Sequence, residues 1–159
     1  MILTKSPYIM QGDTDMNTTQ FNDFFESTVS NALQSPEEYT PTEQLQIIVT
    51  RIIQACGMPA HLRGYRFVRS AIVHTVQEPE MAEAITKLLY PAVAKDCGVS
   101  VIGVERAIRH AIEVVWNRGG YQVLNAYFDY PLWCAEIRPT NHEFIATIAD
   151  RLRIKVHNM

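Results

Sequence analysis

The chain has 159 residues, of which 47% are hydrophobic, so it is long enough for one domain with a buried core and too short for two ordinary domains. Its formal net charge of −3 argues, taken alone, against nucleic acid as a partner. The charge is unevenly distributed, however, because residues 1–44 hold seven acids and one base, whereas residues 45–159 hold thirteen bases and ten acids. We therefore expect an acidic N-terminal arm over residues 1–40 and a mildly basic domain over residues 41–159.

Three cysteines, Cys56, Cys97 and Cys134, are separated by about forty residues each. This number and spacing fit neither a disulfide framework nor a zinc motif, so we expect reduced thiols and no metal. No stretch reaches the roughly 18 apolar residues that a membrane-spanning helix needs, and no signal peptide begins the chain. These features predict a soluble cytoplasmic protein without a cofactor or a membrane partner.

Helical patterns follow one another along the chain and predict an all-α fold. The arm carries an approximate apolar stripe, which predicts a short helix that covers core surface or pairs with a second copy: Phe21, Phe24, Phe25, Val29, Ala32 and Leu33. Thr40, Pro41 and Glu43 then form a capping-box signature, followed by apolar residues at helical spacing. We expect this first domain helix to span residues 41–55.

Two more helices are predicted before residue 91. Gly64 is expected to allow a tight turn into a helix from Tyr65 to Gln77, which Pro79 closes. The pattern is helical again from Glu80, but Pro91 removes a backbone donor and should break the helix at Tyr90. A short helix should then run from Pro91 to about Asp96.

The stretch from Ser100 to Arg118 has the clearest amphipathic pattern. Apolar side chains recur at i, i+3, i+4, i+7, i+8 and i+11, and charged residues occupy the other face. With the preceding short helix it has the packing requirements of a helix-turn-helix. A small residue lies in the first helix, a glycine in the turn, and a branched apolar residue in the second helix: Ala94, Gly98 and Val104.

The last third of the chain predicts one short helix, a loop and a final helix. Tyr121, Leu124, Tyr127 and Phe128 suggest the short helix, whose aromatic residues face either a partner or a satellite core. Residues 130–138 are expected to be extended or looped. Thr140 and Glu143 form a second capping box, and the helix that follows carries its positive charge in the last turns: Arg151, Arg153 and Lys155.

Four segments of the chain resemble a known family. They are GMPAHLRGY at 57–65, LYPAVAK at 89–95, VERAIRHAIEVVW at 104–116 and PTNHEFIA at 139–146. They are similar to the C-terminal DNA-binding effector domains of the sporulation stage-zero response regulator A, and the similarity runs without gaps from about Leu45 to the end. The resemblance implies a six-helix domain whose helix-turn-helix reads operator boxes of the TGNCGAA type in double-stranded DNA. It also implies activation of transcription through a sigma factor of RNA polymerase.

The resemblance assigns roles to individual residues. Glu105 and Arg106 match the residues that read base edges, and their chemistry agrees, since Arg pairs with guanine O6 and N7 while Glu accepts from cytosine N4. The residues expected at the DNA backbone are Ser100, Arg109, His110, His61 and Arg63. The segment that contacts the sigma factor in the family corresponds to Tyr121, Leu124 and Phe128. In this segment the chain shares few residue identities with the family.

Two departures from the family are expected to matter. At the start of the DNA-reading helix, the small or polar residues and the arginine of the family are replaced by Val101, Ile102 and Gly103. If the apolar side chains of Val101 and Ile102 face the groove, their natural partners are thymine methyl groups. The family also carries a phosphorylated receiver domain, for which residues 1–44 are too short. We therefore expect phosphorylation-driven dimerisation not to operate in the usual way, although a homodimer stays open.

Two other classes of function compete with DNA binding as interpretations of the sequence. The chain could be a receiver-less interaction module, or an antagonist that pairs with a full-length sporulation regulator through the arm. An enzyme is not expected, because His110 and Glu113 share a helix face without a nucleophile beside a positioned base. His61, His74 and His142 are interpreted as loop or packing histidines.

Overall fold

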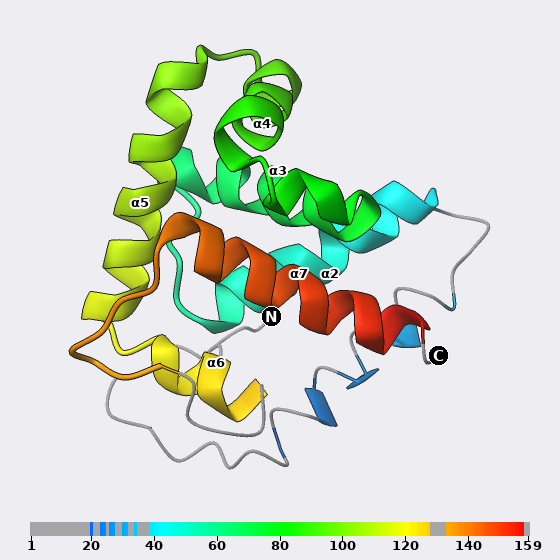
Figure 1. Ribbon diagram of the computed structural model, residues 1–159. Coiled ribbons are helices and arrows are strands. Elements are labelled where there is room, and N and C mark those ends of the chain that lie inside the picture. The colour runs from blue at the N-terminus through cyan, green and yellow to red at the C-terminus, as the bar shows by residue number, and fades with distance from the viewer. Residues whose placement is uncertain are drawn as a thin grey trace. The chain divides into compact units, whose positions relative to one another are not determined.

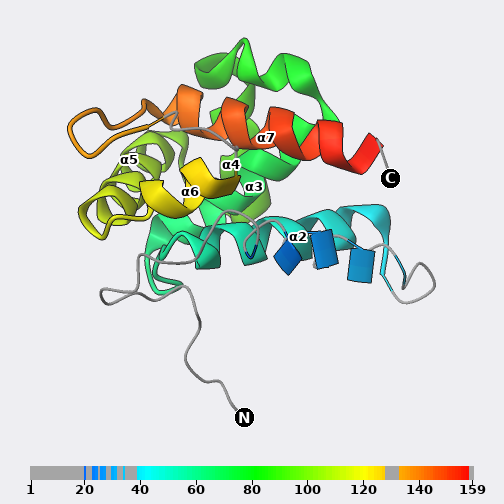
Figure 2. The same cartoon turned by 90° about the horizontal axis from the view of Figure 1, so that it is seen from below.

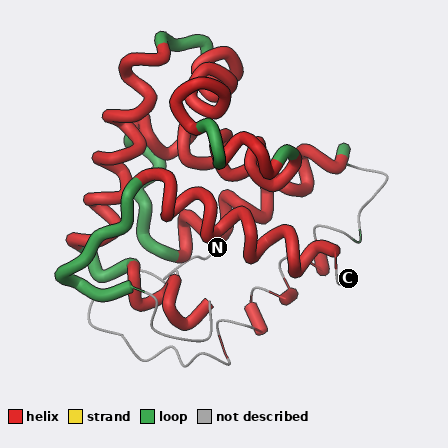
Figure 3. Tube along the Cα trace, viewed as in Figure 1, coloured by secondary structure: helices red, strands yellow, loops and turns green. Residues whose placement is uncertain are grey.

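A computed structural model of the chain describes residues 20, 23–24, 26–27, 30–31, 34, 39–127 and 133–157. Over these residues it contains six α-helices and no strand, with one isolated antiparallel bridge between Cys134 and Ile137 (Figure 3). The predicted all-α fold is therefore confirmed. Of the apolar stripe predicted in the arm, only Phe24 is among the described residues, and the others lie outside them: Phe21, Phe25, Val29, Ala32 and Leu33.

The chain divides into two compact units. The first comprises the described parts of Met1–Met58 and Val114–Arg138, and the second those of Pro59–Glu113 and Pro139–Met159. Helix α5 (Val101–Asn117) begins in the second unit and ends in the first.

Helix α2 (Pro41–Ala55) in the first unit has the predicted bounds. Its capping box is formed, because Thr40 Oγ1 accepts from the Glu43 amide at 3.2 Å and the Glu43 carboxylate accepts from the Thr40 amide at 2.8 Å. The apolar stripe that the sequence predicted for this helix is buried: Leu45, Ile48, Val49, Ile52 and Ile53. The local sequence signals were sufficient here because cap, proline and stripe all favour the same helix.

Helix α6 (Tyr121–Tyr127) in the first unit supports an aromatic cluster around Trp116. The Trp116 and Trp133 rings meet edge to face at 5.3 Å, and Trp116 Nε1 donates to the Cys134 carbonyl at 3.0 Å. The Asn125 amide donates to the Trp133 carbonyl at 2.6 Å and accepts from its amide at 2.9 Å. Of the aromatic residues for which the sequence left a partner or a core role open, Tyr121 is half-buried and lies with its ring 5.8 Å from the Trp116 ring.

Helix α3 (Arg63–Gln77) is central to the second unit and packs against α4 (Tyr90–Cys97) and α7 (Asn141–His157) (Figure 2). It begins at Arg63, before the predicted start at Tyr65, so Gly64 lies inside the helix and not in a tight turn. A Cβ atom on Gly64 would lie 2.2 Å from the Ala107 carbonyl oxygen. The glycine therefore serves the close approach of α3 to α5, which a single sequence does not reveal.

The continuous helix predicted from Glu80 to Tyr90 is wrong. The structure has a 3₁₀ segment η1 (Pro79–Ala82) and a π-helical segment η2 (Ile85–Leu89), after which α4 starts at Tyr90. In η2 the Leu89 amide donates to the Ala84 carbonyl at 3.4 Å, a contact across five residues. Because Pro91 has no amide hydrogen and its ring crowds the preceding turn, the wider π geometry accommodates it. The sequence predicted a break at Tyr90, but the backbone is helical through Leu89 and Tyr90, and the interruption lies at Ala84, with φ −129° and ψ 56°.

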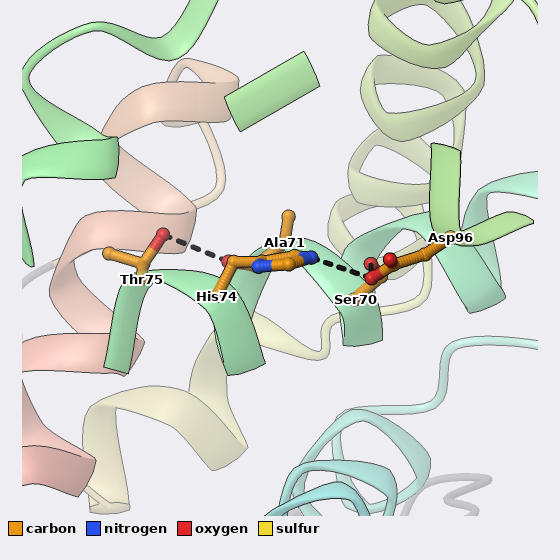
Figure 4. Close-up of polar contacts among 5 residues, drawn as sticks. All are labelled: Ser70, Ala71, His74, Thr75 and Asp96. Carbon is orange, nitrogen blue, oxygen red and sulfur yellow. Dashed lines mark hydrogen bonds and ion pairs between the residues drawn. The ribbon is translucent and has the colours of Figure 1, made fainter. Parts of the chain in front are cut away.

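Helix α3 is tied to the C-terminal end of α4 by polar side chains (Figure 4). His74 Nε2 lies 2.6 Å from Asp96 Oδ2, and Ser70 Oγ donates to the same oxygen at 3.2 Å. The buried hydroxyl of Thr75 donates to the Ala71 carbonyl of its own helix at 2.8 Å, which satisfies it internally. These contacts fix the end of α4 from which the chain turns into α5.

Candidate nucleic-acid interface

Helices α4 and α5 are joined by a short turn at Gly98 (Figure 1). Gly98 has φ +66°, the left-handed conformation that the sequence predicted for it. Ala94 and Val104, the two other residues predicted to pack the corner, are 4% and 0% exposed. All three packing requirements of a helix-turn-helix are therefore met.

Helix α5 has two faces, as the sequence predicted. Its buried face is formed by branched and small apolar residues: Val104, Ile108, Ala111, Ile112 and Val115. The opposite face is exposed in the second unit and carries the predicted DNA-contacting residues: Glu105, Arg106, Arg109 and His110. Ser100, directly before the helix, is exposed as well. The helix thus presents a charged surface that is not required for packing.

Glu105 and Arg109 are paired on this exposed surface. Arg109 Nη2 donates to Glu105 Oε1 across one helical turn. The Arg109 side chain is 56% exposed and the Glu105 side chain is 50% exposed. An exposed pair of this spacing contributes about 0.3–0.5 kcal/mol, so a nucleic acid could exchange these contacts at small cost. The pairing nevertheless holds both groups in position beside Arg106.

The N-terminal end of α3 lies beside the first turns of α5. Gly64 meets Ala107, and a Cβ atom on Gly103 would lie 3.7 Å from Arg63 Nη2. The Arg63 side chain also lies over the Phe67 ring at 5.9 Å, which supports the guanidinium group. The structure therefore brings Arg63 together with the start of α5, although the two are about forty residues apart in the sequence. His61 is exposed in the loop that precedes α3.

Two further cations of α3 lie near the turn and were not identified from the sequence. Burial raises the pKa of the Cys97 thiol, and nearby Arg66 and Arg69 partly oppose this shift. Arg69 also lies over the Tyr65 ring at 5.6 Å. The repeat of Arg63, Arg66 and Arg69 at intervals of three residues was the sequence signal that could have revealed them.

Asn141, at the start of α7, links the two helices of the helix-turn-helix. Its Nδ2 donates to the Tyr90 hydroxyl in α4 and to the Glu105 carbonyl in α5, both at 3.1 Å. Burial raises the pKa of the Tyr90 hydroxyl, and the hydrogen bond from Asn141 partly offsets this effect. The sequence indicated only a helix cap in this region, and its hydrogen bond from the Glu143 amide to Thr140 Oγ1 is formed at 3.1 Å.

Of the residues predicted to contact a sigma factor, those that the structure describes are less exposed than the residues predicted to contact DNA on α5. Tyr121 is half-buried with its ring 5.8 Å from the Trp116 ring, and Leu124 is fully buried. Phe128 lies outside the described residues. The Leu124 side chain therefore packs inside the first unit, so that a partner would meet the surface of α6 around it.

All three cysteines of the chain lie among the described residues. Cys56, Cys97 and Cys134 are free thiols, as predicted, and burial raises the pKa of Cys56 to about 12. Within the described part of the chain, no three His, Cys, Asp or Glu side chains gather as a metal ion would require. No helix in that part is both long and apolar enough to cross a membrane.

A comparison with protein families now adds to this geometry. Residues 49–152 match the family model described as sporulation initiation factor Spo0A C terminal. The match covers α3, α4, α5 and α6 entirely, residues 49–55 of α2 and most of α7, and so includes the helix-turn-helix and the loop before α3. The family consists of DNA-binding effector domains of sporulation regulators and not of enzymes. The chain therefore belongs to the Spo0A C-terminal family of DNA-binding, transcription-regulating domains.

Proposed function

We propose that the chain regulates transcription by reading an operator box in double-stranded DNA with the exposed face of α5. The observation that carries this proposal is the charged, exposed surface of a helix that follows a well-packed helix-turn-helix. Arg106 reads a guanine through O6 and N7, and Glu105 accepts from a cytosine N4. The Glu105 carboxylate has two oxygens, so one can remain with Arg109 while the other meets the base.

The remaining cations hold the DNA backbone. Arg63 lies beside the start of α5, and Arg109 and His110 continue the exposed face toward its middle. With Ser100 and His61 they supply donors around the base-reading residues, which is the usual distribution of phosphate contacts. We expect modest affinity because a single domain binds, and a strong dependence on salt because these contacts are made to phosphates.

The finer parts of the regulatory role are proposed from the family. An operator similar to the TGNCGAA type and a sigma factor as second partner are what the resemblance implies, with the surface of α6 around Tyr121 as the contact. A second copy of the chain is a further candidate partner. We also propose that residues 1–40 are an arm distinct from a DNA-binding domain over residues 41–159, because the acidic residues concentrate before residue 44.

An alanine substitution at Arg106 tests the assignment of the base-reading residue. Arg106→Ala should weaken binding to the preferred duplex by roughly 1–3 kcal/mol, and should relax selectivity at one base pair. Binding to a random duplex should change much less, because the variant loses a contact to a base edge and keeps the contacts to the DNA backbone. Fluorescence anisotropy titrations of both duplexes at one salt concentration measure the two effects.

Arg51→Ala is the matched control, since it removes the same charge from an exposed position of α2. It should lower the affinity for both duplexes slightly and equally. If Arg106→Ala bound the two duplexes as the unaltered chain does, Arg106 would not be the reader. If no duplex were preferred by the unaltered chain, sequence-specific binding itself would be refuted.

A further inference from the structure

The first turn of α5 exposes an isoleucine. Ile102 is 86% exposed, more than any other large hydrophobic side chain that the structure describes as exposed. Its neighbour Val101 is 40% exposed, and Gly103 has no side chain. Single exposed apolar residues are common on protein surfaces, so exposure alone carries no conclusion. The position of Ile102 on the helix is what makes it informative.

Ile102 lies on the DNA-facing side of α5. Residues three and four positions apart share a helix face, so Ile102 is in line with Glu105 and Arg106. Ile102 and Arg106 are four positions apart, so they are separated by about 6 Å along the helix axis. Stacked base pairs are about 3.4 Å apart, so this distance corresponds to about two base pairs. In a helix-turn-helix, the N-terminal residues of the second helix approach the base edges.

A protein partner fits this side chain poorly. The exposed residues that follow it on the same face are charged: Glu105, Arg106 and Arg109. A single apolar side chain in such surroundings offers far less than the roughly 800 Å² that each partner of a stable interface buries. The cations around it, Arg106 and Arg63 beside Gly103, are instead complementary to phosphate.

Within a major groove, the chemistry of isoleucine selects one base. Its side chain neither donates nor accepts hydrogen bonds, so contact with the polar edge of guanine, adenine or cytosine would leave base groups desolvated and unpaired. Thymine presents a C5 methyl group, which is the apolar feature of the groove. Gly103 adds no bulk beside Ile102 that would hold the helix away from the base.

We propose that Ile102 is a specificity-determining residue that contacts the C5 methyl group of a thymine within about two base pairs of the one read by Arg106. The inference rests on the proposed function, since it requires α5 to enter the major groove. It adds a base preference that the charged residues of the helix do not supply.

Replacement of thymine by deoxyuridine tests this contact, because it removes only the methyl group. A preferred duplex is first obtained by selection, and each thymine is then changed to deoxyuridine in turn. For the full chain, one position near the Arg106 contact should lose affinity by about fourfold, the value expected for one buried methyl group. Ile102→Ala should bind the thymine and deoxyuridine duplexes equally at that position.

Ile154→Ala is the matched control. Ile154 is 48% exposed on α7, so the same truncation is made outside the proposed groove contact. This variant should keep the fourfold preference for the methyl group.

Three results would overturn the inference. One is a preferred box without thymine in the predicted interval, and another is equal affinity of the full chain for thymine and deoxyuridine at every position. The third is a methyl preference that persists in Ile102→Ala. In each case the proposed function stands if the full chain still prefers the selected duplex and Arg106→Ala loses that preference. If the full chain prefers no duplex, the proposed function fails together with the inference.

Discussion

Gly64 and Gly103 both lie in helices that frame the proposed DNA-binding surface, but only Gly64 leaves no space for a side chain. At Gly64 the helices approach so closely that an added Cβ would meet the Ala107 carbonyl at 2.2 Å and the Ala111 Cβ at 2.8 Å. At Gly103 the nearest atom is Arg63 Nη2 at 3.7 Å, an ordinary contact with a flexible side chain. The first glycine is therefore required for packing, whereas the second is not.

Gly64→Ala should destabilise the protein. The new methyl group collides with backbone, which cannot rotate away, and overpacking of this kind costs about 1–3 kcal/mol. That cost exceeds the roughly 0.5–1 kcal/mol that alanine gains over glycine in a helix. Urea denaturation followed by circular dichroism measures the free energy of unfolding, and Gly103→Ala provides the comparison, with stability unchanged or raised by up to about 1 kcal/mol. Equal stabilities of the two variants would contradict the close approach of α3 and α5.

At the scale of the elements, α4 and α5 are held by contacts from two other helices. Asp96 at the end of α4 meets His74 and Ser70 of α3, while Asn141 of α7 reaches Tyr90 and Glu105. The second anchor acts on the helix that carries the residues proposed to contact DNA. Because its acceptor in α5 is the Glu105 carbonyl, the anchor positions the backbone and leaves the Glu105 carboxylate available.

Asn141→Ala should lower both stability and DNA affinity. It removes two hydrogen bonds and leaves the hydroxyl of the buried Tyr90 and the Glu105 carbonyl to find other partners, for which about 1–3 kcal/mol is expected. His142→Ala, at the exposed neighbouring position in the first turn of α7, should change little. The two variants are compared by urea denaturation and by titration of the preferred duplex. If they unfolded at the same urea concentration, the anchor would be shown to contribute nothing.

The elements also show which parts of the fold a sequence can predict. Helix α2 and the corner at Gly98 were predicted because the cap, the glycine and the apolar spacing are local signals. The 3₁₀ and π segments before α4 were missed because apolar spacing alone does not distinguish them from an α-helix crowded by Pro91. Their geometry depends on how the chain enters α4, which is settled by packing.

At the scale of the whole molecule, the surface predicted from the family resemblance coincides with exposed residues in one compact unit. Glu105, Arg106 and Arg109 lie on one helix face, so their common placement followed from periodicity. Asn141 could not be placed in the same way, because its hydrogen-bond partners come from other helices. The fold was thus more predictable than the contacts that surround its proposed site.

The overall charge also limits how the molecule meets DNA. A formal net charge of −3 gives little long-range attraction to a polyanion, so binding must depend on the local arrangement of cations around α5. A protein of this kind gains most of its preference for one site from base contacts. Nonspecific binding should therefore weaken sooner than specific binding as salt is raised.

Selection of bound duplexes from a random pool at moderate salt tests the central claim most directly. The full chain should enrich one short box in which a guanine and a cytosine contacted by Arg106 and Glu105 are strongly preferred, with a resemblance to the TGNCGAA type. A thymine should recur within about two base pairs of that guanine. Recovery of unrelated sequences without a common motif, after the same rounds of selection, would contradict the proposal that this protein reads DNA through α5.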